Sequence, residues 1–303
     1  MADPITVFDR HILKLRRDRA ASRASEFNFL FAETADRLAD RLEDTTRSFP
    51  RAVDLGCHSG ELAQILAASS RVETLHQADI SYRYAKAARD LNGRSSMVAD
   101  EEFLPFAEGS LDLILSNLSL HWVNDLPGML LQARRALKSD GLFLASMLGG
   151  ETLKDLREAL MTAEAEEEGG VSPRVSPFVD VKDAGALLQR SGFALPVVDA
   201  DDITIDYPDA LKLMRDLSGM GESNIVAKRS KKFTKRSTLA RAAAIYHERH
   251  GREDGRVHAK FQVIYLTGWA PDESQPKPLR RGSGQVSLVD FLGDVPDKPE
   301  PKN

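Results

Sequence analysis

The sequence contains very little cysteine and has no long hydrophobic run. Its 303 residues include one cysteine, Cys57, so no disulfide can form within the chain and a reducing compartment is expected. No apolar stretch approaches the ~20 residues that a membrane-spanning helix needs. The first residues lack a basic segment followed by an apolar one, so no secretory signal is expected. We therefore expect no membrane span, and association with a membrane surface stays open.

An excess of basic charge is also missing. The chain has 41 lysines and arginines against 46 aspartates and glutamates, which gives a net charge of −5. We therefore do not expect nucleic-acid binding through a strongly basic surface. The exception is the dense basic segment 228–236, in which Phe233 is the one aromatic residue. This segment is either a solvated loop or a surface that steers an acidic partner.

The segment 1–50 predicts two helices, at about 5–23 and 27–44. The first helix carries Arg16 and Arg17 on its charged side. The helix is either a solvated surface element or a lid whose arginines reach an anionic group near the glycine turn that follows.

Residues 51–147 alternate between apolar strand-like runs and helical patterns. Strands are expected at 51–55, 72–78, 97–99, 111–115 and 142–145, with helices at 61–69, 82–91 and 125–137. Such alternation predicts an α/β fold with a doubly wound, mostly parallel sheet. Ligands of these sheets bind outside the carboxyl ends of the strands.

The second half predicts further helices and two more strands. Helices are expected at 151–167, 180–191 and 209–217, and strands at 202–207 and 261–266. The acid run 164–168 is typical of a solvated helix end. The last two strands are separated by ~50 residues, far beyond an ordinary connection, so 208–258 is expected to form a cap over the substrate. The main domain would then span 51–270.

Composition changes after the last strand. Residues 271–303 are polar and punctuated by proline, so we expect a disordered tail with a short docking segment at 286–292.

The turn after the first strand is rich in small residues. Asp54 and Gly56 end the strand, and Gly60 opens the next helix. Glycine lets the backbone approach a ligand, and a helix N-terminus presents unpaired N–H groups. The turn therefore predicts a phosphate- or nucleoside-binding corner. Cys57, inside it, is expected to be a packing residue, because no histidine-paired nucleophile is visible.

Polar residues follow the next three strands. Asp79 lies nineteen residues past Gly60, where an acidic side chain accepts hydrogen bonds from ribose hydroxyls. Asp100 and Glu101 follow the third strand, where a carboxylate can accept from an adenine amine, and Asn117 follows the fourth. Asp79 could instead serve a helix cap. Together these residues describe an adenosine-shaped site.

This set of motifs resembles the class I S-adenosylmethionine-dependent methyltransferases. The matching segments are 53–57, Asp79, Asp100 with 104–106, 110–122 and 134–141. The resemblance implies a seven-stranded sheet and S-adenosylmethionine as cofactor. It assigns cofactor binding to Asp54, Gly56, Cys57, His58, Gly60, Asp79, Ile80, Asp100, Glu101 and Asn117. His58 stands where the family usually has the middle glycine of a Gly-x-Gly-x-Gly turn.

Three later segments resemble one branch more closely. The segments 148–153, 169–178 and 217–224 are similar to the respiratory complex I assembly factor five family and its bacterial relatives. The similarity spans about 7–270, whereas the malonyl-carrier-protein methyltransferases are similar over the first half only. The family implies hydroxylation of an arginine on an iron–sulfur subunit of complex I. It also implies a cytoplasmic location in a bacterium or the mitochondrial matrix in a eukaryote.

Two other functions stay open. One is methyl transfer to a small molecule or a carrier-bound acyl group, and the other is a non-catalytic assembly chaperone. His121 and Trp122 follow the fourth strand, where His121 is either a base or a packing residue. Glu222 and Asn224 could recognise an arginine side chain, and Arg16 could reach a substrate from the N-terminal helix. The histidines near residue 250 do not make a convincing metal site. The sequence does not predict the oligomeric state.

Overall fold

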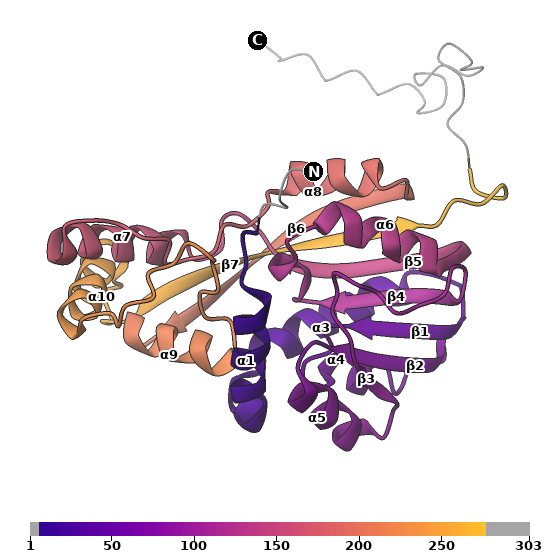
Figure 1. The fold of residues 1–303 in the computed structure, drawn as a ribbon, viewed down its shortest axis with the longest axis horizontal. Helices are drawn as coiled ribbons and strands as arrows, with labels where there is room; N and C mark the ends of the chain where they lie inside the picture. Colours follow the sequence, from indigo (N-terminus) through magenta and orange to yellow (C-terminus); the bar gives the residue numbers. More distant parts are fainter. Residues whose placement is uncertain (1–5, 277–303) are drawn as a thin grey trace, which may run out of the picture. The chain divides into compact units, whose positions relative to one another are not determined.

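The computed structural model describes residues 6–276, of which residues 6–271 form one compact unit (Figure 1). Its centre is a seven-stranded sheet in the order β3-β2-β1-β4-β5-β7-β6. The first five strands are parallel, and β7 runs antiparallel to both of its neighbours. The expected doubly wound, mostly parallel sheet is confirmed. The strands are β1 Phe49–Leu55, β2 Val72–Asp79, β3 Ser96–Val98, β4 Leu111–Asn117, β5 Leu137–Leu148, β6 Ala194–Tyr207 and β7 Val257–Trp269.

Helices cover both faces of the sheet. They are α1 Arg10–Ala20, α2 Ala24–Phe27, α3 Phe29–Glu43, α4 Glu61–Ile65, α5 Tyr82–Asn92, α6 Leu126–Ala136, α7 Lys154–Glu168, α8 Val181–Arg190, α9 Ala210–Met220 and α10 Arg236–His250. Apolar side chains of α3 and α4 join one buried cluster, and those of α6 and α8 join the cluster on the other face. In α3, Leu30, Leu38 and Leu42 are fully buried, and each contributes about 1.5–3 kcal/mol by burial.

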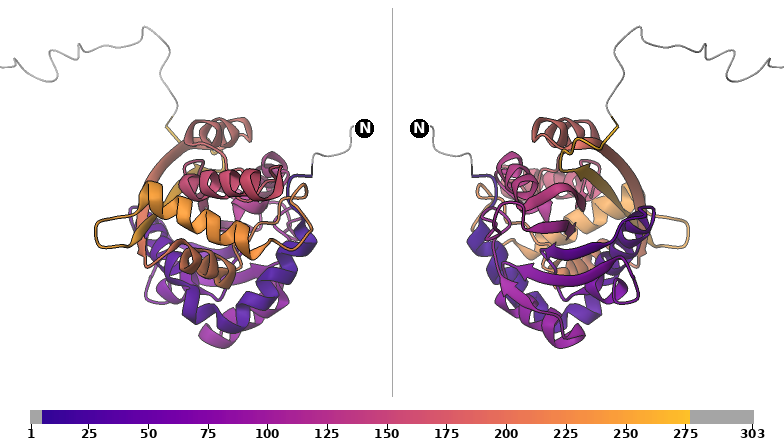
Figure 2. Two further views of the ribbon diagram at one scale, coloured as in Figure 1. Left: turned by 90° about the vertical axis from the view of Figure 1, so that its left-hand side faces the viewer. Right: turned by 90° about the vertical axis from the view of Figure 1, so that its right-hand side faces the viewer.

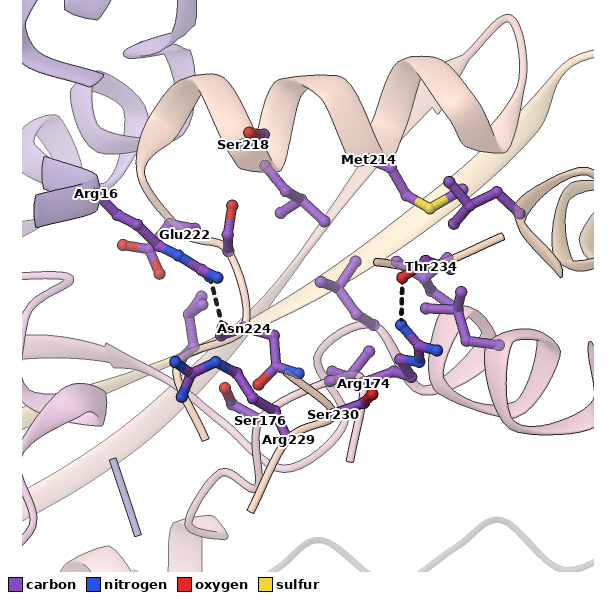
Figure 3. A pocket seen from close by; sticks show the side chains of 18 of the residues that line it. Arg16, Arg174, Ser176, Met214, Ser218, Glu222, Asn224, Arg229, Ser230 and Thr234 are labelled. Carbon is purple, nitrogen blue, oxygen red and sulfur yellow. Dashed lines mark hydrogen bonds between the residues drawn. The ribbon is translucent and has the colours of Figure 1, made fainter. Parts of the chain in front are cut away.

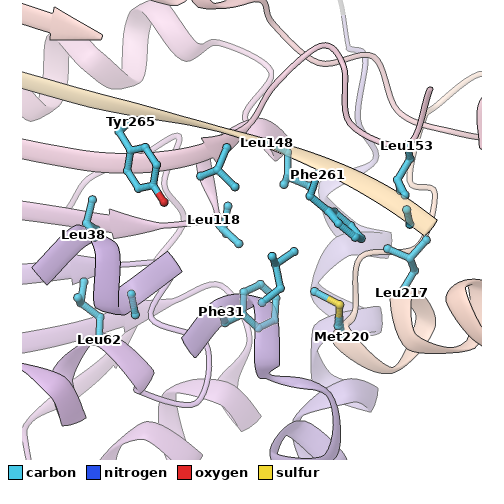
Figure 4. Packing of buried hydrophobic residues seen from close by; sticks show 14 of the residues in the cluster. Phe31, Leu38, Leu62, Leu118, Leu148, Leu153, Leu217, Met220, Phe261 and Tyr265 are labelled. Carbon is cyan, nitrogen blue, oxygen red and sulfur yellow. The ribbon is translucent and has the colours of Figure 1, made fainter. Parts of the chain in front are cut away.

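The strands β6 and β7 form a long antiparallel pair that extends past the ends of the other strands. The helices α7, α9 and α10 pack against this extension (Figure 1). These three helices face the viewer in the left panel of Figure 2. Their apolar side chains belong to the same buried cluster as those of α3. In Figure 4, Leu217 and Met220 of α9 lie beside Phe261 of β7 and Phe31 of α3. The inserted helices α9 and α10 therefore share the core of the sheet.

Several expected boundaries were wrong. The first helix begins at Arg10, because the Asp9 side chain caps it by accepting from the Ile12 amide, and Phe8 pairs with Val226 as an isolated bridge. Strand β5 is much longer than the expected 142–145. Helix α4 is shorter than the expected 61–69 and ends at Ile65, where the amide of the C-cap residue Leu66 donates to the carbonyls of Leu62 and Gln64.

The acid run is a larger correction. Glu164 was expected in a solvated helix end, but its side chain is only 5% exposed. It accepts hydrogen bonds from the Ser172 amide and hydroxyl and from Arg174. A buried carboxylate keeps its charge when it has such partners. The sequence could not show this pairing, since the loop beyond α7 had no predicted path.

The predicted tail falls mostly outside the described residues, because 277–303, including the segment 286–292, is not described. Over residues 6–276, no helix is both long enough and apolar enough to cross a membrane.

Candidate functional site

The polar residues predicted at the strand ends come together at one edge of the sheet. Parallel pairing places Asp54 beside Leu115, and Asp79 beside Val98. The turn at Gly56 is fastened to β2, because its amide and that of Cys57 both donate to the carbonyl of Ala78. The sheet topology therefore gathers Asp54, Asp79, Asp100, Glu101 and Asn117 around the turn.

Asp79 is fully buried and accepts three hydrogen bonds. Its Oδ1 accepts from the Ser81 amide at 2.7 Å, and its Oδ2 accepts from the His58 amide at 3.2 Å and from Arg17 at 3.3 Å. Burial raises the pKa of Asp79 to about 6 even though Arg17 opposes the shift. Ser81, not Asp79, provides the side-chain cap of α5.

Glu101 is the centre of an ion-pair network. It pairs with Arg10 and with Arg17, and the Ser119 hydroxyl donates to it at 2.5 Å. Burial opposes ionisation of Glu101, but the two arginines outweigh it and lower the pKa of this carboxyl to about 2. Asp100 is partly exposed and also pairs with Arg10. The network keeps Glu101 charged inside the protein.

Gly56 lies directly beneath this network. Its φ is +69°, and an added Cβ would stand 2.1 Å from the Ser119 hydroxyl oxygen and 3.1 Å from Glu101 Oε1. Only glycine fits here. The space above the turn is therefore filled by the chain's own side chains.

His58 is the residue that departs from the glycine pattern, and its φ is +48°. Its ring is buried and stacks on Phe31 with the ring centres 4.0 Å apart. Nε2 lies 3.2 Å from the carbonyl of Asn117 and 3.3 Å from that of Leu118. Burial and the nearby Arg17 lower the pKa of His58 to about 3, so the ring is neutral. His58 is thus an interior packing residue that joins the turn to α3.

Asp54 is fully buried, and neither carboxyl oxygen has a hydrogen-bond partner among the described residues. Burial raises the pKa of Asp54 to about 8, with Glu61 and Asp79 adding to the shift. The group is therefore protonated near neutral pH. It is an acidic side chain without a partner directly before the glycine turn.

We expect the Asp54→Asn variant to be more stable than the wild type at high pH. The folded-state pKa of about 8 lies above the ordinary ~3.9. The contribution of Asp54 to stability is therefore full below about pH 4 and is lost as the pH rises to about 8. At ~1.4 kcal/mol per unit, the gap in unfolding free energy should grow by about 3 kcal/mol between about pH 5.5 and 8.5, as measured by urea denaturation. Asp44→Asn, at an exposed position, is the control. An equal gap at both pH values would contradict this account.

A second cluster joins the sheet edge to the α9–α10 segment. Glu222 follows α9 and accepts at 2.9 Å from the ring Nε2 of His121 and at 2.9 Å from the indole Nε1 of Trp122. The Leu148 amide lies 3.5 Å from Nδ1 of His121, so Nδ1 is the acceptor and Nε2 carries the proton. Burial raises the pKa of Glu222, but His121 and Arg17 outweigh it and hold the pKa below its usual range. Both nitrogens of His121 are thus engaged, and its prediction as a base stays untested.

Trp122 and Glu222 form part of the wall of a cavity of about 550 Å³ (Figure 3). Its floor is apolar and comes mainly from α7, α9 and the end of β5. The apolar lining includes Leu148, Leu153, Leu156, Leu160, Met214 and Leu217. Its polar rim includes Arg16, Arg174, Arg229 and Asn224. The cavity lining is therefore largely apolar and includes three arginines, of which Arg174 and Arg229 are ion-paired with Glu164 and Asp9.

The structure places the predicted substrate residues at this rim. Arg16 donates to the carbonyl of Asn224, and Asn224 donates from its side chain to the carbonyl of Pro173. Burial and the neighbouring Arg229 lower the pKa of Arg16. Arg174, which the sequence did not single out, also lines the cavity and donates to Thr234 (Figure 3).

Two further site residues escaped sequence reasoning. Arg10 was not singled out, and Ser119 was read only as part of a motif. Arg17 had been considered as part of a lid, and the structure shows it in contact with the buried acids. Among residues 6–276, no group of three or more histidine, cysteine, aspartate or glutamate side chains is arranged to hold a metal ion.

Comparison with known proteins agrees with this architecture. The family model of a methyltransferase domain matches residues 53–145. The phosphoethanolamine N-methyltransferase 2 of Haemonchus contortus, solved with S-adenosyl-L-methionine, is similar with a TM-score of 0.55 at 14% identity. The match covers 86% of this chain and 60% of that one, and at this identity it shows the fold alone. The predicted class I methyltransferase fold is confirmed.

Full-length relatives are more informative. The mitochondrial arginine-hydroxylase NDUFAF5 of Danio rerio is 46% identical over 291 residues, covering 95% of this chain and 90% of the relative. The malonyl-[acyl-carrier protein] O-methyltransferase of Laribacter hongkongensis is 31% identical, covering 95% of this chain and 97% of the relative. The similarity to such methyltransferases was expected over the first half only, and that expectation was wrong.

Proposed function

This chain belongs to the arginine-hydroxylase NDUFAF5 family, and we propose that it hydroxylates an arginine side chain of a protein substrate. The supporting observation is that the 46% identity to such a hydroxylase extends over 95% of the chain. Both kinds of relative extend over the helices around the cavity, but the hydroxylase does so at 46% identity and the methyltransferase at 31%. Two proteins that act on the same substrate need similar residues around the site that binds it, so the higher identity supports the hydroxylase function.

The sequence resemblance suggests an iron–sulfur subunit of respiratory complex I as this substrate, in the bacterial cytoplasm or the mitochondrial matrix. Hydroxylation converts a bond to hydrogen into a bond to a hydroxyl group. With O2 as the oxidant it consumes two electrons and two protons and releases one water, and all of these reactants come from outside the chain. The part assigned to the chain is to bind and orient the arginine. Glu222 is the carboxylate proposed for this recognition, because it is buried at the cavity wall and is held by His121 and Trp122.

We also propose S-adenosylmethionine as the ligand of the sheet edge. The donor set fits adenosine: Asp79 offers carboxylate oxygens for the ribose, Asp100 is partly exposed near the proposed adenine position, and Gly56 adds no Cβ to the turn. When bound, this ligand would supply an activated methyl group. Arg17 and Ser119 now contact the same acids, so they must move for the ligand to enter.

A second function is favoured by the charge of the cavity. Arg16, Arg174 and Arg229 line the cavity together with apolar side chains, and Arg174 and Arg229 are ion-paired with Glu164 and Asp9. This arrangement suits a carboxylate with an apolar chain better than an incoming guanidinium. It supports methyl transfer to an acyl substrate, the reaction named for the malonyl-[acyl-carrier protein] O-methyltransferase relative.

Intact-mass spectrometry separates these functions. The purified chain is incubated with S-adenosylmethionine and either the candidate iron–sulfur subunit, in cell extract as the source of oxidant, or a malonyl-carrier protein. The proposed function predicts a gain of one oxygen atom on the subunit. A gain of CH₂ on the carrier would support the second function, and unchanged masses would leave the chaperone role.

A further inference from the structure

Helix α1 lies between α5 and α9, next to the carboxyl ends of the strands (Figure 1). Arg10, Leu13 and Arg17 are spaced three and four residues apart, so they share one face of the helix. Leu13 is fully buried, the side chain of Arg17 is 1% exposed and that of Arg10 is 12% exposed. This inner face therefore places two guanidinium groups inside the protein at the sheet edge.

The contacts of Arg17 coincide with the groups assigned to adenosine. Its Nη1 lies 3.3 Å from Asp79 Oδ2 and 3.3 Å from Glu101 Oε1, and its Nη2 donates to Ser119 at 3.0 Å. Ser119 in turn stands over Gly56. The ribose acid, the turn and the neighbouring carboxylate are all in contact with the chain's own side chains.

An adjacent side of the same helix, together with its N-cap Asp9, is bonded to residues at the rim of the cavity. Arg16 donates to the carbonyl of Asn224, and the Asp9 amide donates to the carbonyl of Ile225 at 2.9 Å. Asp9 also pairs with Arg229 at 3.5 Å. Consecutive residues, Arg16 and Arg17, therefore reach the two sites from one rigid helix.

We propose that α1 is an internal occupant of the adenosine site and that its displacement couples this site to the cavity. S-adenosylmethionine binds when Arg17 leaves Asp79 and Glu101, and the same movement withdraws Arg16 from the cavity rim. The proposal rests on the proposed cofactor. Binding to a state that is only partly populated weakens the apparent affinity by the populated fraction. By thermodynamic linkage, a substrate that displaces Arg16 strengthens cofactor binding. The factor is the same as that by which the cofactor strengthens substrate binding.

Calorimetry with S-adenosylmethionine tests the competition. Measured at about pH 8.5, to favour the charged form of Asp79, Arg17→Met, which keeps a long side chain and removes the charge, should bind at least about tenfold more tightly than the wild type, because less of the population is closed. Arg19→Met, on an exposed part of the same helix, should bind like the wild type. Equal or weaker binding by Arg17→Met would overturn the proposal and leave the cofactor assignment intact. No binding by either protein would overturn the cofactor assignment and, with it, this coupling.

Hydrogen exchange on the full-length wild type tests the displacement without any variant. Saturating S-adenosylmethionine should speed amide exchange in residues 10–20 and at Asp9 and Ala227, whose amides donate to the carbonyls of Ile225 and Val7 and tie the segment before α1 to the segment after α9. Slower exchange in both segments would mean that α1 closes over the ligand, which contradicts the proposal. This measurement decides the question even if Arg17→Met folds poorly.

Discussion

Replacing Arg17 with methionine is expected to lower the free energy of unfolding by about 3–5 kcal/mol. The side chain is 1% exposed and lies between Asp79 and Glu101, which are both fully buried. Without the guanidinium, the negative charges of two buried carboxylates face each other with one cation fewer to offset their repulsion. Arg10 still pairs with Glu101, so Asp79 would lose its cation and should take up a proton. Typical stabilities of 5–15 kcal/mol leave a folded protein to measure.

Urea denaturation at two pH values checks this expectation. The loss should be smaller at about pH 5 than at about pH 8, because Asp79, whose pKa is already raised to about 6, is neutral at the lower value. Arg19→Met is the matched control, and a change within about 0.5 kcal/mol is expected there. A loss below about 1 kcal/mol for Arg17→Met, or a loss that does not depend on pH, would show that Arg17 does not hold the two acids together.

Replacing Glu222 with alanine is expected to slow substrate modification by at least about 100-fold, because the charged carboxylate that would pair with the substrate guanidinium is lost. The His121 ring and the Trp122 indole would each keep a buried N–H without its acceptor. The cavity would lose the carboxylate that we assign to the substrate guanidinium. The measurement is the fraction of the candidate subunit that is modified with time.

Glu253→Ala, at an exposed position in the same inserted segment, is the control and should keep the wild-type rate. Glu222→Gln distinguishes charge from shape, because its amide fills the same space and its oxygen can still accept from His121 and Trp122, but it carries no charge to pair with a guanidinium. We expect it to remain folded and to turn over nearly as slowly as Glu222→Ala. A wild-type rate for either Glu222 variant would remove this residue from the site.

The sequence predicted which polar residues gather at the sheet edge, because the topology of a parallel sheet fixes where the strand ends lie. Asp79 and Asp100 end neighbouring parallel strands, so any such sheet brings them together. The alternation of strands and helices was sufficient for this conclusion. The exact ends of β5 and α4 were missed, since caps and strand extensions depend on contacts with other elements.

The contacts made by charged side chains could not be predicted in the same way. Arg17 reaches Asp79 across 62 residues, and His121 reaches Glu222 across 101 residues. No periodicity connects such pairs. Glu164 was misread as solvated for the same reason, because its partner Arg174 lies in an irregular loop. The direction of the His58 ring also depended on Phe31, which belongs to a helix that precedes the sheet.

The most direct test of the central claim is the mass of the complex I iron–sulfur subunit in the chain's own host. The subunit is purified from a strain with the gene intact, from a deletion strain and from the deletion strain complemented with Glu222→Ala, and its arginine-containing peptides are fragmented. We predict one additional oxygen atom on a single arginine in the intact strain and none in the other two. An arginine of the same mass in all three strains, or a gain of CH₂ in place of oxygen, would contradict the proposed function.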